Sequence, residues 1–496
     1  MSNDQQVAVP RTMIETLKRR MSRMSDVGAE HTKPLKNTEA QIALEFADAL
    51  IAGDFRYGTG GLMWFNGVKY EPIYDSQIQS ALYECMRSIG VGSVYIVNSI
   101  PIIAKTGLRA IEIKPFNPNR GLVAFRNGTI DLDTMELATP ASEDMETSTY
   151  VDIDYDPKSD CPKFKEFLMQ VLPDSDSQRI VQEFCGALFV NRRKYHIDKL
   201  LYLLGDGRNG KGVFLECIQA VLGDKNCTNY SMSDLCKGQH KMSNIAQCSG
   251  KLVNICYDMS KNDVSGGEFK SIVSGERQTG RYMYKDTFAV TDLPLFMAAV
   301  NEVPVTTDHS FGHARRHLII PFERRIPEDM VNPMLAKELI REAPGILNWM
   351  FHGRSRFLAN GAKFATSQKL EQLSRDVRRR GNSILSFCYD SQYFGSQQDN
   401  MIRCEKSNEE LYKEYVAYCK ANGNMVASSG TFTNGLTRMP DLEFEVIRMS
   451  NGQRGKAFYK PIEGYIYDDE KRKTVPVGEV IDYEKIADEV YNDLPF

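Results

Sequence analysis

A glycine-rich loop between an apolar strand and a helix constrains this chain more than any other feature. The loop runs Gly205-Asp206-Gly207-Arg208-Asn209-Gly210-Lys211-Gly212, after the apolar residues 200–204 and before a helical pattern over 213–222. Glycines let backbone N–H groups surround a phosphate, a helix N-terminus attracts its charge, and a lysine reaches the terminal phosphates. We expect an α/β fold that binds ATP through Gly205, Gly207, Arg208, Asn209, Gly210, Lys211, Gly212 and Val213.

The loop departs from the usual pattern at its last position. Ser or Thr normally follows the lysine and supplies a hydroxyl to Mg²⁺, whereas this chain has Gly212. A surface glycine turn is the alternative interpretation, but the flanking strand and helix favour phosphate binding. Because Mg²⁺ keeps several of its waters, we expect it to be held here partly through water.

Composition limits the remaining classes of protein. The chain has 496 residues, enough for two or three domains, with ordinary apolar (42%) and charged (25%) fractions. Its net charge of -4 means that any nucleic-acid binding needs a local basic surface. Its 11 cysteines contain no C-x-x-C pair, and no secretion signal or membrane-length apolar run is present. We expect reduced thiols and a cytoplasmic location, in the host cell if the protein is viral.

Patterning along the chain predicts several elements and domains. Turns at Asn66-Gly67 and Asn127-Gly128 indicate hairpins in an accessory domain. Near the C-terminus, helical patterns over 408–422 and 428–439 precede strand-like residues 444–448 and 456–460, which is typical of a winged helix. We expect a flexible N-terminus (1–37), an accessory α+β domain (38–180), an ATPase domain (181–360), a linker helix with a winged helix (361–463) and an acidic tail (464–496).

Three strands after the loop carry polar residues at or near their ends. Asp258 follows the strand 251–256, and Asn301 follows the strand 293–300, so both are expected at the loop's edge of the sheet. Arg315 and Arg316 precede the strand 317–320. Hydrolysis needs a carboxylate for metal or water, a polar sensor of the γ-phosphate and a cation. Lys211, Asp258, Asn301, Arg316 and Arg315 fit these roles, with Asp258 as the expected Mg²⁺ ligand.

The accessory region offers a competing acidic motif. Asp152, Asp154 and Asp156 alternate along the chain and could hold two metals for nucleotidyl transfer, which would make the chain a primase as well. An exposed strand edge leading into a turn at Asp156-Pro157 is the interpretation we favour, because no second acidic cluster lies nearby.

The ordered motifs resemble a known family. The glycine loop, the strand before Asp258, the segment 269–275, the strand into Asn301 and the segment 315–322 together resemble superfamily 3 helicases of the phage, plasmid and poxvirus primase-helicase group. The resemblance extends over about residues 40–465, since the flanking regions are similar as well. It implies an AAA+-like ATPase core forming a homo-hexameric ring that threads single-stranded DNA and unwinds forked DNA.

The resemblance also assigns roles to individual residues. Arg316, with Arg315 as second choice, would be the finger that reaches the next subunit's nucleotide. The segment between Asp258 and Asn301 would hold a DNA-contacting hairpin, whose cations and aromatics are Lys270, Arg281, Tyr282, Tyr284 and Lys285. A solvated hairpin is the plain alternative. Family members often have a carboxylate pair where this chain has Tyr257-Asp258, so Asp263 or Glu268 could share the work of Asp258, and slow hydrolysis is expected.

Two other functions remain open at this point. The chain could be an origin-binding replication initiator whose ATP site is mainly an assembly switch, with the winged helix on duplex DNA. A DNA-packaging motor is less favoured, because no nuclease-like acidic cluster follows the ATPase region. The C-terminal residues 493–496 resemble the tip of bacterial single-stranded-DNA-binding proteins and could recruit replication proteins. The basic run 378–380 is most simply a solvated helix face.

Overall fold

The structure is a computed structural model of the whole chain. It describes residues 55–58, 61–73, 77, 80, 81, 83, 84, 121–139, 145–259, 266–283, 286–303, 311–390, 407–422, 426–437, 443–448, 454–459, 465–468 and 473–476. The expected flexible N-terminus (1–37) and the C-terminal residues 493–496 lie outside these ranges.

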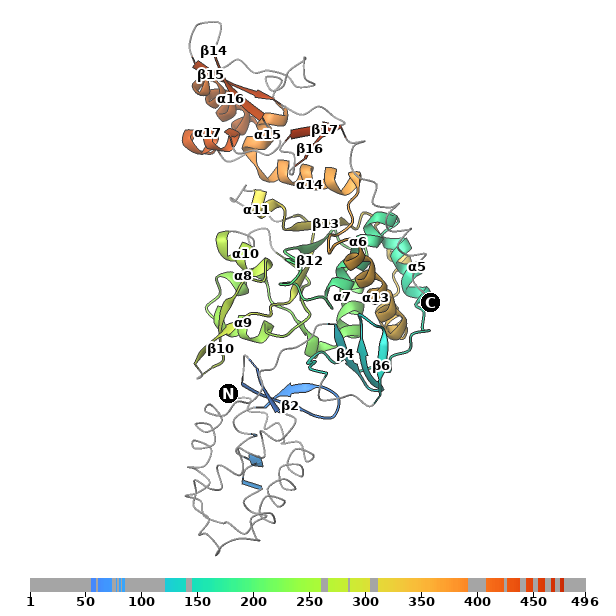
Figure 1. The fold of residues 1–496 in the computed structure, drawn as a ribbon. Helices are drawn as coiled ribbons and strands as arrows, with labels where there is room; N and C mark the ends of the chain where they lie inside the picture. Colours follow the sequence, from blue (N-terminus) through green and yellow to red (C-terminus); the bar gives the residue numbers. More distant parts are fainter. Residues whose placement is uncertain are drawn as a thin grey trace, which may run out of the picture. The chain divides into compact units, whose positions relative to one another are not determined.

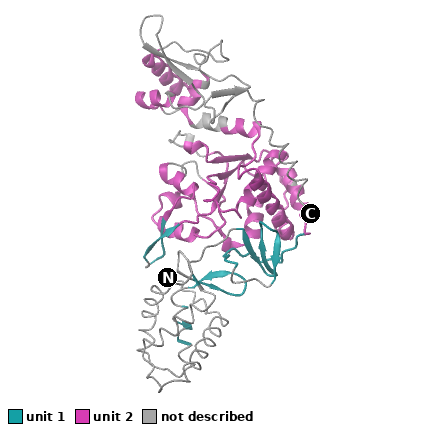
Figure 2. Ribbon diagram, in the orientation of Figure 1, with its two compact units in different colours: residues 1–157, 279–290 teal, residues 158–278, 291–496 magenta. Residues whose placement is uncertain are grey.

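The chain divides into two compact units (Figure 2). One contains residues 1–157 and 279–290, and the other contains residues 158–278 and 291–496. The second unit therefore begins at residue 158, whereas the sequence suggested that the accessory domain extends to residue 180. The difference arises because helices α5 (Pro162–Val171) and α6 (Ser175–Ala187) pack with the sheet-bearing unit.

A five-stranded parallel sheet is the centre of the second unit (Figure 1). Its order is β13-β7-β12-β9-β8, so β7 lies between strands that come much later in the chain. All neighbouring pairs are parallel, which confirms the expected α/β class. The strands are β7 (Leu200–Leu204), β8 (Cys227–Thr228), β9 (Val253–Cys256), β12 (Leu295–Val300) and β13 (His317–Pro321).

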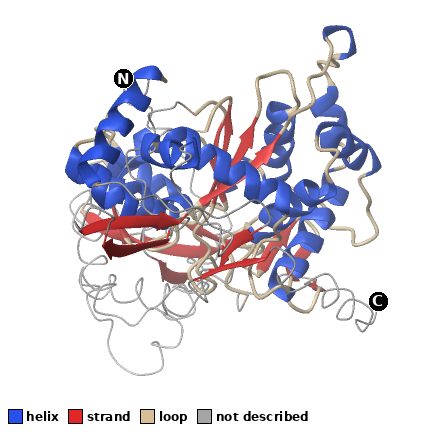
Figure 3. Cartoon of the chain, turned by 90° about the horizontal axis from the view of Figure 1, so that it is seen from above, coloured by secondary structure: helices blue, strands red, loops and turns tan. Residues whose placement is uncertain are grey.

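These strands are buried on both faces because helices cover the sheet. Every residue of β9 and β12 is buried, as parallel strands under helices require. Helices lie on both sides of the central strands (Figure 3). Between residues 211 and 359 the helices of this unit are α7 (Lys211–Leu222), α8 (Met232–Cys236), α9 (Lys241–Cys248), α10 (Gly266–Val273), α11 (Phe311–Ala314), α12 (Leu335–Ile340) and α13 (Ala343–Ala359), with 3-10 turns at Asp224–Asn226 and Glu328–Met330.

The sequence also has helical patterns over residues 334–358 and 366–390, each of which predicts one continuous helix, and the structure interrupts both. The pattern over 334–358 forms α12 and α13, and Pro344 stands in the first turn of α13, where its missing N–H costs nothing. The pattern over 366–390 forms α14 (Gln368–Gly381) and α15 (Ser383–Asp390). Between them, Oδ1 of Asn382 accepts from the N–H groups of Ile384 and Leu385 and so begins a new helix.

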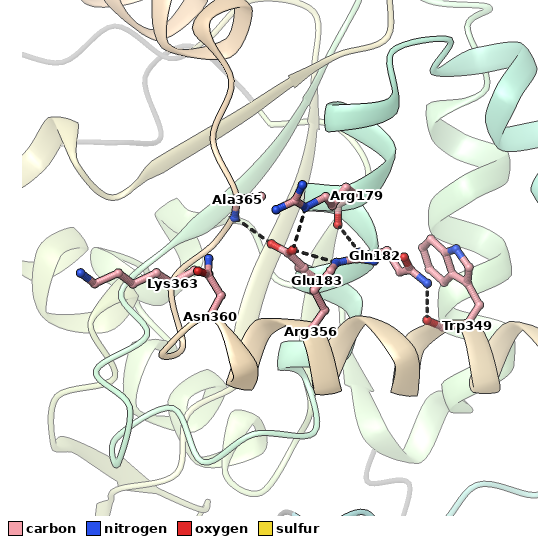
Figure 4. A network of polar contacts seen from close by, with 8 residues as sticks. All are labelled: Arg179, Gln182, Glu183, Trp349, Arg356, Asn360, Lys363 and Ala365. Carbon is pink, nitrogen blue, oxygen red and sulfur yellow. Dashed lines mark hydrogen bonds and ion pairs between the residues drawn. The ribbon is translucent and has the colours of Figure 1, made fainter. Parts of the chain in front are cut away.

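A buried ion pair joins α6 to α13 and to the chain before α14 (Figure 4). The Glu183 carboxylate has no exposed surface and lies 3.0 Å from Nε of Arg356. Its other oxygen accepts from the backbone N–H of Ala365 at 2.8 Å. The two helices cross so closely at Gly186 that a Cβ there would lie 2.0 Å from the backbone nitrogen of Arg354. Burying a carboxylate is costly unless it is paired in this way, so the network sets the register of these segments.

The first unit is built from short antiparallel sheets. Strands β1 (Phe55–Gly58), β2 (Gly61–Phe65) and β3 (Tyr70–Pro72) form one, and β4 (Leu122–Phe125), β5 (Gly128–Asp131) and β6 (Glu136–Ala138) form another. The turns at Asn66-Gly67 and Asn127-Gly128 connect strands as predicted. Strands β10 (Gln278–Arg281) and β11 (Thr287–Val290) form a two-stranded sheet, and residues 279–290 group with this unit.

The C-terminal region contains the predicted helices and strands. Helices α15, α16 (Asn408–Ala421) and α17 (Ser429–Thr437) share a core that includes Tyr415 and Phe432, whose rings stack at 4.5 Å. Strands β14 (Glu443–Arg448) and β15 (Arg454–Tyr459) pair antiparallel. The acidic tail starts with structure that we did not predict, the paired strands β16 (Tyr465–Asp468) and β17 (Lys473–Pro476), which are rich in β-prone residues.

Candidate nucleotide site

The glycine loop connects the central strand β7 to α7 as the sequence predicts. Leu204 ends β7, and α7 begins at Lys211. Gly210 precedes the helix with φ of 85°, and no side chain caps the first turn of α7. Uncapped amides at a helix N-terminus attract an anion.

Two glycines of the loop are required by close packing. A Cβ on Gly205 would lie 2.0 Å from Nδ2 of Asn209 and 2.6 Å from the carbonyl oxygen of Phe322. A Cβ on Gly210 would lie 2.6 Å from Cγ1 of Val171, in a left-handed conformation that already disfavours side chains. The loop therefore has no room for other residues at these points.

The remaining loop residues are held from the chain after β13. The Arg208 guanidinium forms an exposed ion pair with Glu328 at 2.9 Å, and the Arg208 carbonyl oxygen accepts from the N–H of Ile326 at 2.8 Å. Arg208 has φ of 50°, next to Gly207 with φ of 94°. Successive left-handed residues make the loop curve back on itself, and Val213 follows in the first turn of α7, half-buried.

Lys211 points back across the loop. Its Nζ donates to the carbonyl oxygen of Gly205 at 2.5 Å and to Oδ1 of Asn209 at 2.9 Å. Burial lowers the pKa of Lys211, and the neighbouring Asp206 carboxylate partly opposes this. The Lys211 ammonium is thus partly desolvated, and its hydrogen-bond acceptors here are neutral. An anion bound in the loop would stabilise its charge.

Asp258 and Asn301 lie at the same edge of the sheet as the loop. Register pairs Ala298 of β12 with Cys256 of β9, and Val300 with Leu204 of β7, so both polar residues follow strands that end at this edge. Both side chains are exposed. The sequence prediction of a common edge for these two residues is therefore confirmed.

The metal ligands expected here can be tested against the surroundings. A Cβ on Gly212 would meet no heavy atom within 4 Å, which leaves space for a hydrated ion. Glu268 is engaged in an ion pair with Lys241 at 2.8 Å, and Asp263 lies outside the described residues. Among the described residues, no three His, Cys, Asp or Glu side chains gather in a way that could hold a metal. The donors present fit Mg²⁺ bound by one carboxylate, phosphate and water.

The two candidate finger arginines lie at the other edge of the sheet. His317 pairs with Leu200 at the start of β13 and β7, and Arg315 and Arg316 come just before it. The strands between this edge and the loop are about 13 Å long, four steps of ~3.3 Å. Neither arginine therefore lies beside the glycine loop of its own chain.

These two arginines differ in their surroundings. Arg316 is buried, and its guanidinium donates to Oγ of Ser274 from Nε at 3.0 Å and from Nη2 at 2.7 Å, and to the carbonyl oxygen of Gly312. Arg315 is 45% exposed and forms an ion pair with Asp198 at 2.6 Å. Our prediction named Arg316 first, but of the two side chains only that of Arg315 is accessible to another molecule.

The candidate DNA-contacting residues are only partly described. Lys270 is half-buried on α10, and Arg281 is exposed at the end of β10. Tyr282 stacks on Phe288 across the hairpin at 5.3 Å, and Met283 is 73% exposed at the tip. Tyr284 and Lys285 lie outside the described residues.

The acidic motif of the accessory unit is an exposed surface feature. Asp152 forms an ion pair with Arg126 at 2.9 Å and accepts from the Tyr150 hydroxyl at 2.9 Å. The same contact raises the pKa of Arg126. Asp154 and Asp156 are exposed, and a turn follows at residues 157 and 158. Asp152 is thus paired with a cation, as a surface segment would be.

Sequence reasoning missed two residues that hold the candidate finger arginines and one contact of the glycine loop. Asp198 holds Arg315, Ser274 holds Arg316, and Asn209 joins the loop to Phe322. Asp198 and Ser274 are ordinary polar residues far from these arginines in the chain, so only the fold brings them into contact. Asn209 stood inside the motif, but its second partner could not be seen in the sequence.

Comparison with known protein families covers both units. A family model described as D5 N terminal like matches residues 55–173, and one described as a family of unknown function (DUF5906) matches residues 203–316, which include the loop, Asp258 and Asn301. Both matches agree with the primase-helicase resemblance that the ordered motifs indicated.

Individual relatives of this chain are distant. "Putative helicase L207/L206" of Acanthamoeba polyphaga mimivirus is 24% identical over 224 residues, which are 42% of this chain and 22% of that protein. The aligned region thus spans about a fifth of that relative. Two solved apo structures of the NrS-1 C terminal region align at 12% identity with a TM-score of 0.41, covering 81% and 80% of this chain and 94% and 93% of theirs. Among the described residues, no helix has the length and apolar character needed to cross a bilayer.

Proposed function

We propose that this chain is an ATP-dependent replicative DNA helicase of superfamily 3, working as a homo-hexameric ring on single-stranded DNA. One observation carries the proposal: Lys211, Asp258 and Asn301 gather at one edge of the parallel sheet, while Arg315 is exposed at the opposite edge. A triphosphate bound at the loop needs a cation against its developing charge. Arg315 can supply it only to the site of another copy.

Within one site, the chain's own residues have separate tasks. Lys211 would exchange its two intrachain acceptors for phosphate oxygens, and Asn301 would contact the γ-phosphate. Asp258 would hold Mg²⁺, and the bound ion would neutralise negative charge on the phosphates. The single carboxylate and the missing hydroxyl at Gly212 lead us to expect slow hydrolysis.

DNA contact is assigned to the segment between Asp258 and Asn301. Lys270 and Arg281 supply cations, and Tyr284 and Lys285 belong to the same proposal from the sequence. Six copies of a few basic residues around a narrow pore produce a strong local field although each chain carries a net charge of -4. The helicase description of the mimivirus relative supports the helicase proposal.

The decisive experiment is unwinding of a forked duplex by the purified chain with ATP and Mg²⁺. We expect Lys211→Ala to reduce nucleotide affinity about 10- to 100-fold, the worth of a charged hydrogen bond of roughly 1.5–3 kcal/mol. Lys225→Ala, which changes an exposed lysine in the 3-10 turn after α7, is the control and should behave as the parent. Unwinding by Lys211→Ala at the parent rate, or a chain that stays monomeric with nucleotide and DNA, would refute the proposal.

A second function is favoured by the C-terminal region. Three helices around Tyr415 and Phe432, followed by the β14–β15 pair, have the order of a winged helix, which could bind duplex DNA in a replication initiator. An initiator would bind duplex DNA and assemble with ATP without displacing a strand. Strand displacement on a fork therefore separates the two functions.

A further inference from the structure

Helix α7 has open space at the position where the loop motif normally carries a hydroxyl. Gly212 is exposed in the first turn of the helix, and a Cβ there would meet no heavy atom within 4 Å. Ser or Thr at this position usually supplies an oxygen to Mg²⁺. Any oxygen that α7 offers to the ion here must therefore come from a neighbouring position on the helix.

Glu216 lies one helical turn further along the same face. Residues three and four apart are neighbours on a helix surface, so Gly212, Glu216 and Gln219 form one stripe along α7. Long side chains on a helix point back toward its N-terminus, over the preceding turn. The exposed Glu216 side chain is thus directed over Gly212, which has no side chain to block it.

The same stripe faces the end of β9, the strand that leads to Asp258. The Tyr257 hydroxyl donates to Oε1 of Gln219 at 3.0 Å. Nδ2 of Asn229 donates to the same oxygen at 3.1 Å and to the carbonyl oxygen of Ile255 in β9, also at 3.1 Å. These hydrogen bonds hold the stripe of α7 against the end of the strand.

The negative charge of Glu216 acts at this end of β9. Burial raises the pKa of the Tyr257 hydroxyl, and the Glu216 carboxylate raises it further. In the part of the chain that the structure describes, Glu216 forms no ion pair. Its carboxylate is therefore available to a cation beside the strand that carries Asp258.

We infer that Glu216 is a second acidic contact of the Mg²⁺ at the nucleotide site, made through water across the space that Gly212 leaves open. Mg²⁺ keeps several of its waters and binds few carboxylates directly, so a carboxylate that contacts it through water fits its coordination. This inference rests on the proposed function. It adds a residue of α7 to a metal site for which β9 supplies only Asp258.

Glu216→Gln tests the inference, because it removes the charge and keeps the size of the side chain. Titration of Mg²⁺ into the protein saturated with a non-hydrolysable ATP analogue measures metal affinity without turnover. We expect Glu216→Gln to lower this affinity about tenfold, as loss of a group that contacts a metal through its ligands typically does. The affinity for the analogue in EDTA should stay the same or rise, since a carboxylate near a bare triphosphate repels it.

Asp224→Asn is the matched control. It removes the same charge from an exposed residue in the 3-10 turn beyond the other end of α7. The ten residue steps from Gly212 to Leu222 alone span about 15 Å, so this carboxylate lies far from the first turn of the helix. Its loss should leave the Mg²⁺ affinity unchanged.

Two further variants separate a contact beside Gly212 from a diffuse effect of charge. Glu216→Asp keeps the charge but shortens the side chain, so its Mg²⁺ affinity should be closer to that of Glu216→Gln than to that of the parent. Gly212→Ser in the Glu216→Gln background supplies an oxygen at the open space and should recover most of the affinity. Full affinity in Glu216→Asp, or no recovery in the double variant, overturns the inference.

The remaining outcomes distinguish this inference from the proposed function. Parent Mg²⁺ affinity in Glu216→Gln, or a loss of analogue affinity in EDTA, overturns the role of Glu216 and leaves the helicase proposal standing. A parent protein that binds the analogue with Mg²⁺ but does not unwind a fork overturns only the helicase proposal. A parent protein that binds no nucleotide overturns both.

Discussion

Nζ of Lys211 lies 2.9 Å from Oδ1 of Asn209, whose amide nitrogen donates to the carbonyl oxygen of Phe322 at 3.0 Å. Asn209 thus ties the loop lysine to the residue that follows β13. Its side chain is almost wholly buried, so these contacts are shielded from water.

Loss of this amide should weaken the site without removing the lysine. We expect Asn209→Ala to reduce nucleotide affinity about tenfold and to lower the free energy of unfolding by about 1–3 kcal/mol, since the amide satisfies a buried carbonyl. Titration with a fluorescent nucleotide and chemical denaturation measure the two effects. An unchanged affinity would mean that Lys211 needs no support from Asn209.

Titration of Lys211 should appear in the pH dependence of binding. Burial lowers its pKa from the ordinary 10.5. Nucleotide affinity should therefore fall with rising pH before an ordinary lysine titrates, because the neutral amine attracts phosphate poorly. The free energy of unfolding of the nucleotide-free protein should instead rise over this pH range. The unfolded chain binds the Lys211 proton more tightly than the folded chain, so removal of that proton favours the folded state. Calorimetric binding and unfolding between neutral and alkaline pH check both signs.

The open space beside Gly212 allows the missing hydroxyl to be restored. A side chain at this position meets no heavy atom within 4 Å at its Cβ, so Gly212→Ser should fold normally. We expect the Mg²⁺ concentration for half-maximal hydrolysis to fall about tenfold, which corresponds to a ligand worth ~1.4 kcal/mol. Gly205→Ala is the contrasting variant, since its Cβ would clash with Asn209 and abolish nucleotide binding. No change in Mg²⁺ dependence in Gly212→Ser would place the metal elsewhere.

Exposure of Arg315 and burial of Arg316 predict different defects. Arg315→Ala should reduce hydrolysis strongly, about 10³-fold for a finger arginine, with little loss of stability. Arg316→Ala should lower the melting temperature, because it leaves Ser274 and the end of α10 without their cation. Mixing the Arg315→Ala and Lys211→Ala variants should restore some hydrolysis. In a mixed ring, some sites would combine Lys211 of one copy with Arg315 of its neighbour. If the mixture stays inactive, the arginine does not act between subunits.

The buried Glu183 predicts a purely structural effect. Glu183→Ala removes the carboxylate that pairs with Arg356. It should lower the free energy of unfolding by about 3–5 kcal/mol, the usual result of breaking a buried ion pair. Urea denaturation measures the loss. Glu166→Ala on the exposed face of α5 is the control and should change stability by less than about 0.5 kcal/mol.

Local patterns predicted much of this fold. The strands around Leu204, Cys256 and Val300 were found because parallel strands are continuous apolar runs, and turns at Asn-Gly pairs marked the hairpins. Asp258 and Asn301 could be placed at one edge because parallel strands share their carboxyl ends. These inferences needed only neighbouring residues and a general rule of topology.

Contacts between distant segments could not be predicted. Gly186 and Gly353 let α6 and α13 approach closely, and no local pattern reveals that approach. The burial of Arg316, compared with the exposure of Arg315, depends on Ser274, 42 residues earlier in the chain. The break at Asn382 was missed because its capping side chain resembles any polar residue within an amphipathic pattern.

The placement of Lys211 and Arg315 at opposite ends of β7 has a consequence for how turnover depends on protein concentration. A single copy contains both Lys211 and Arg315 but cannot bring the two side chains together. On dilution, the activity per milligram of protein should therefore fall as the assembly dissociates. Within an assembly, one copy that lacks both residues should inactivate its own nucleotide site and the site of the adjacent copy.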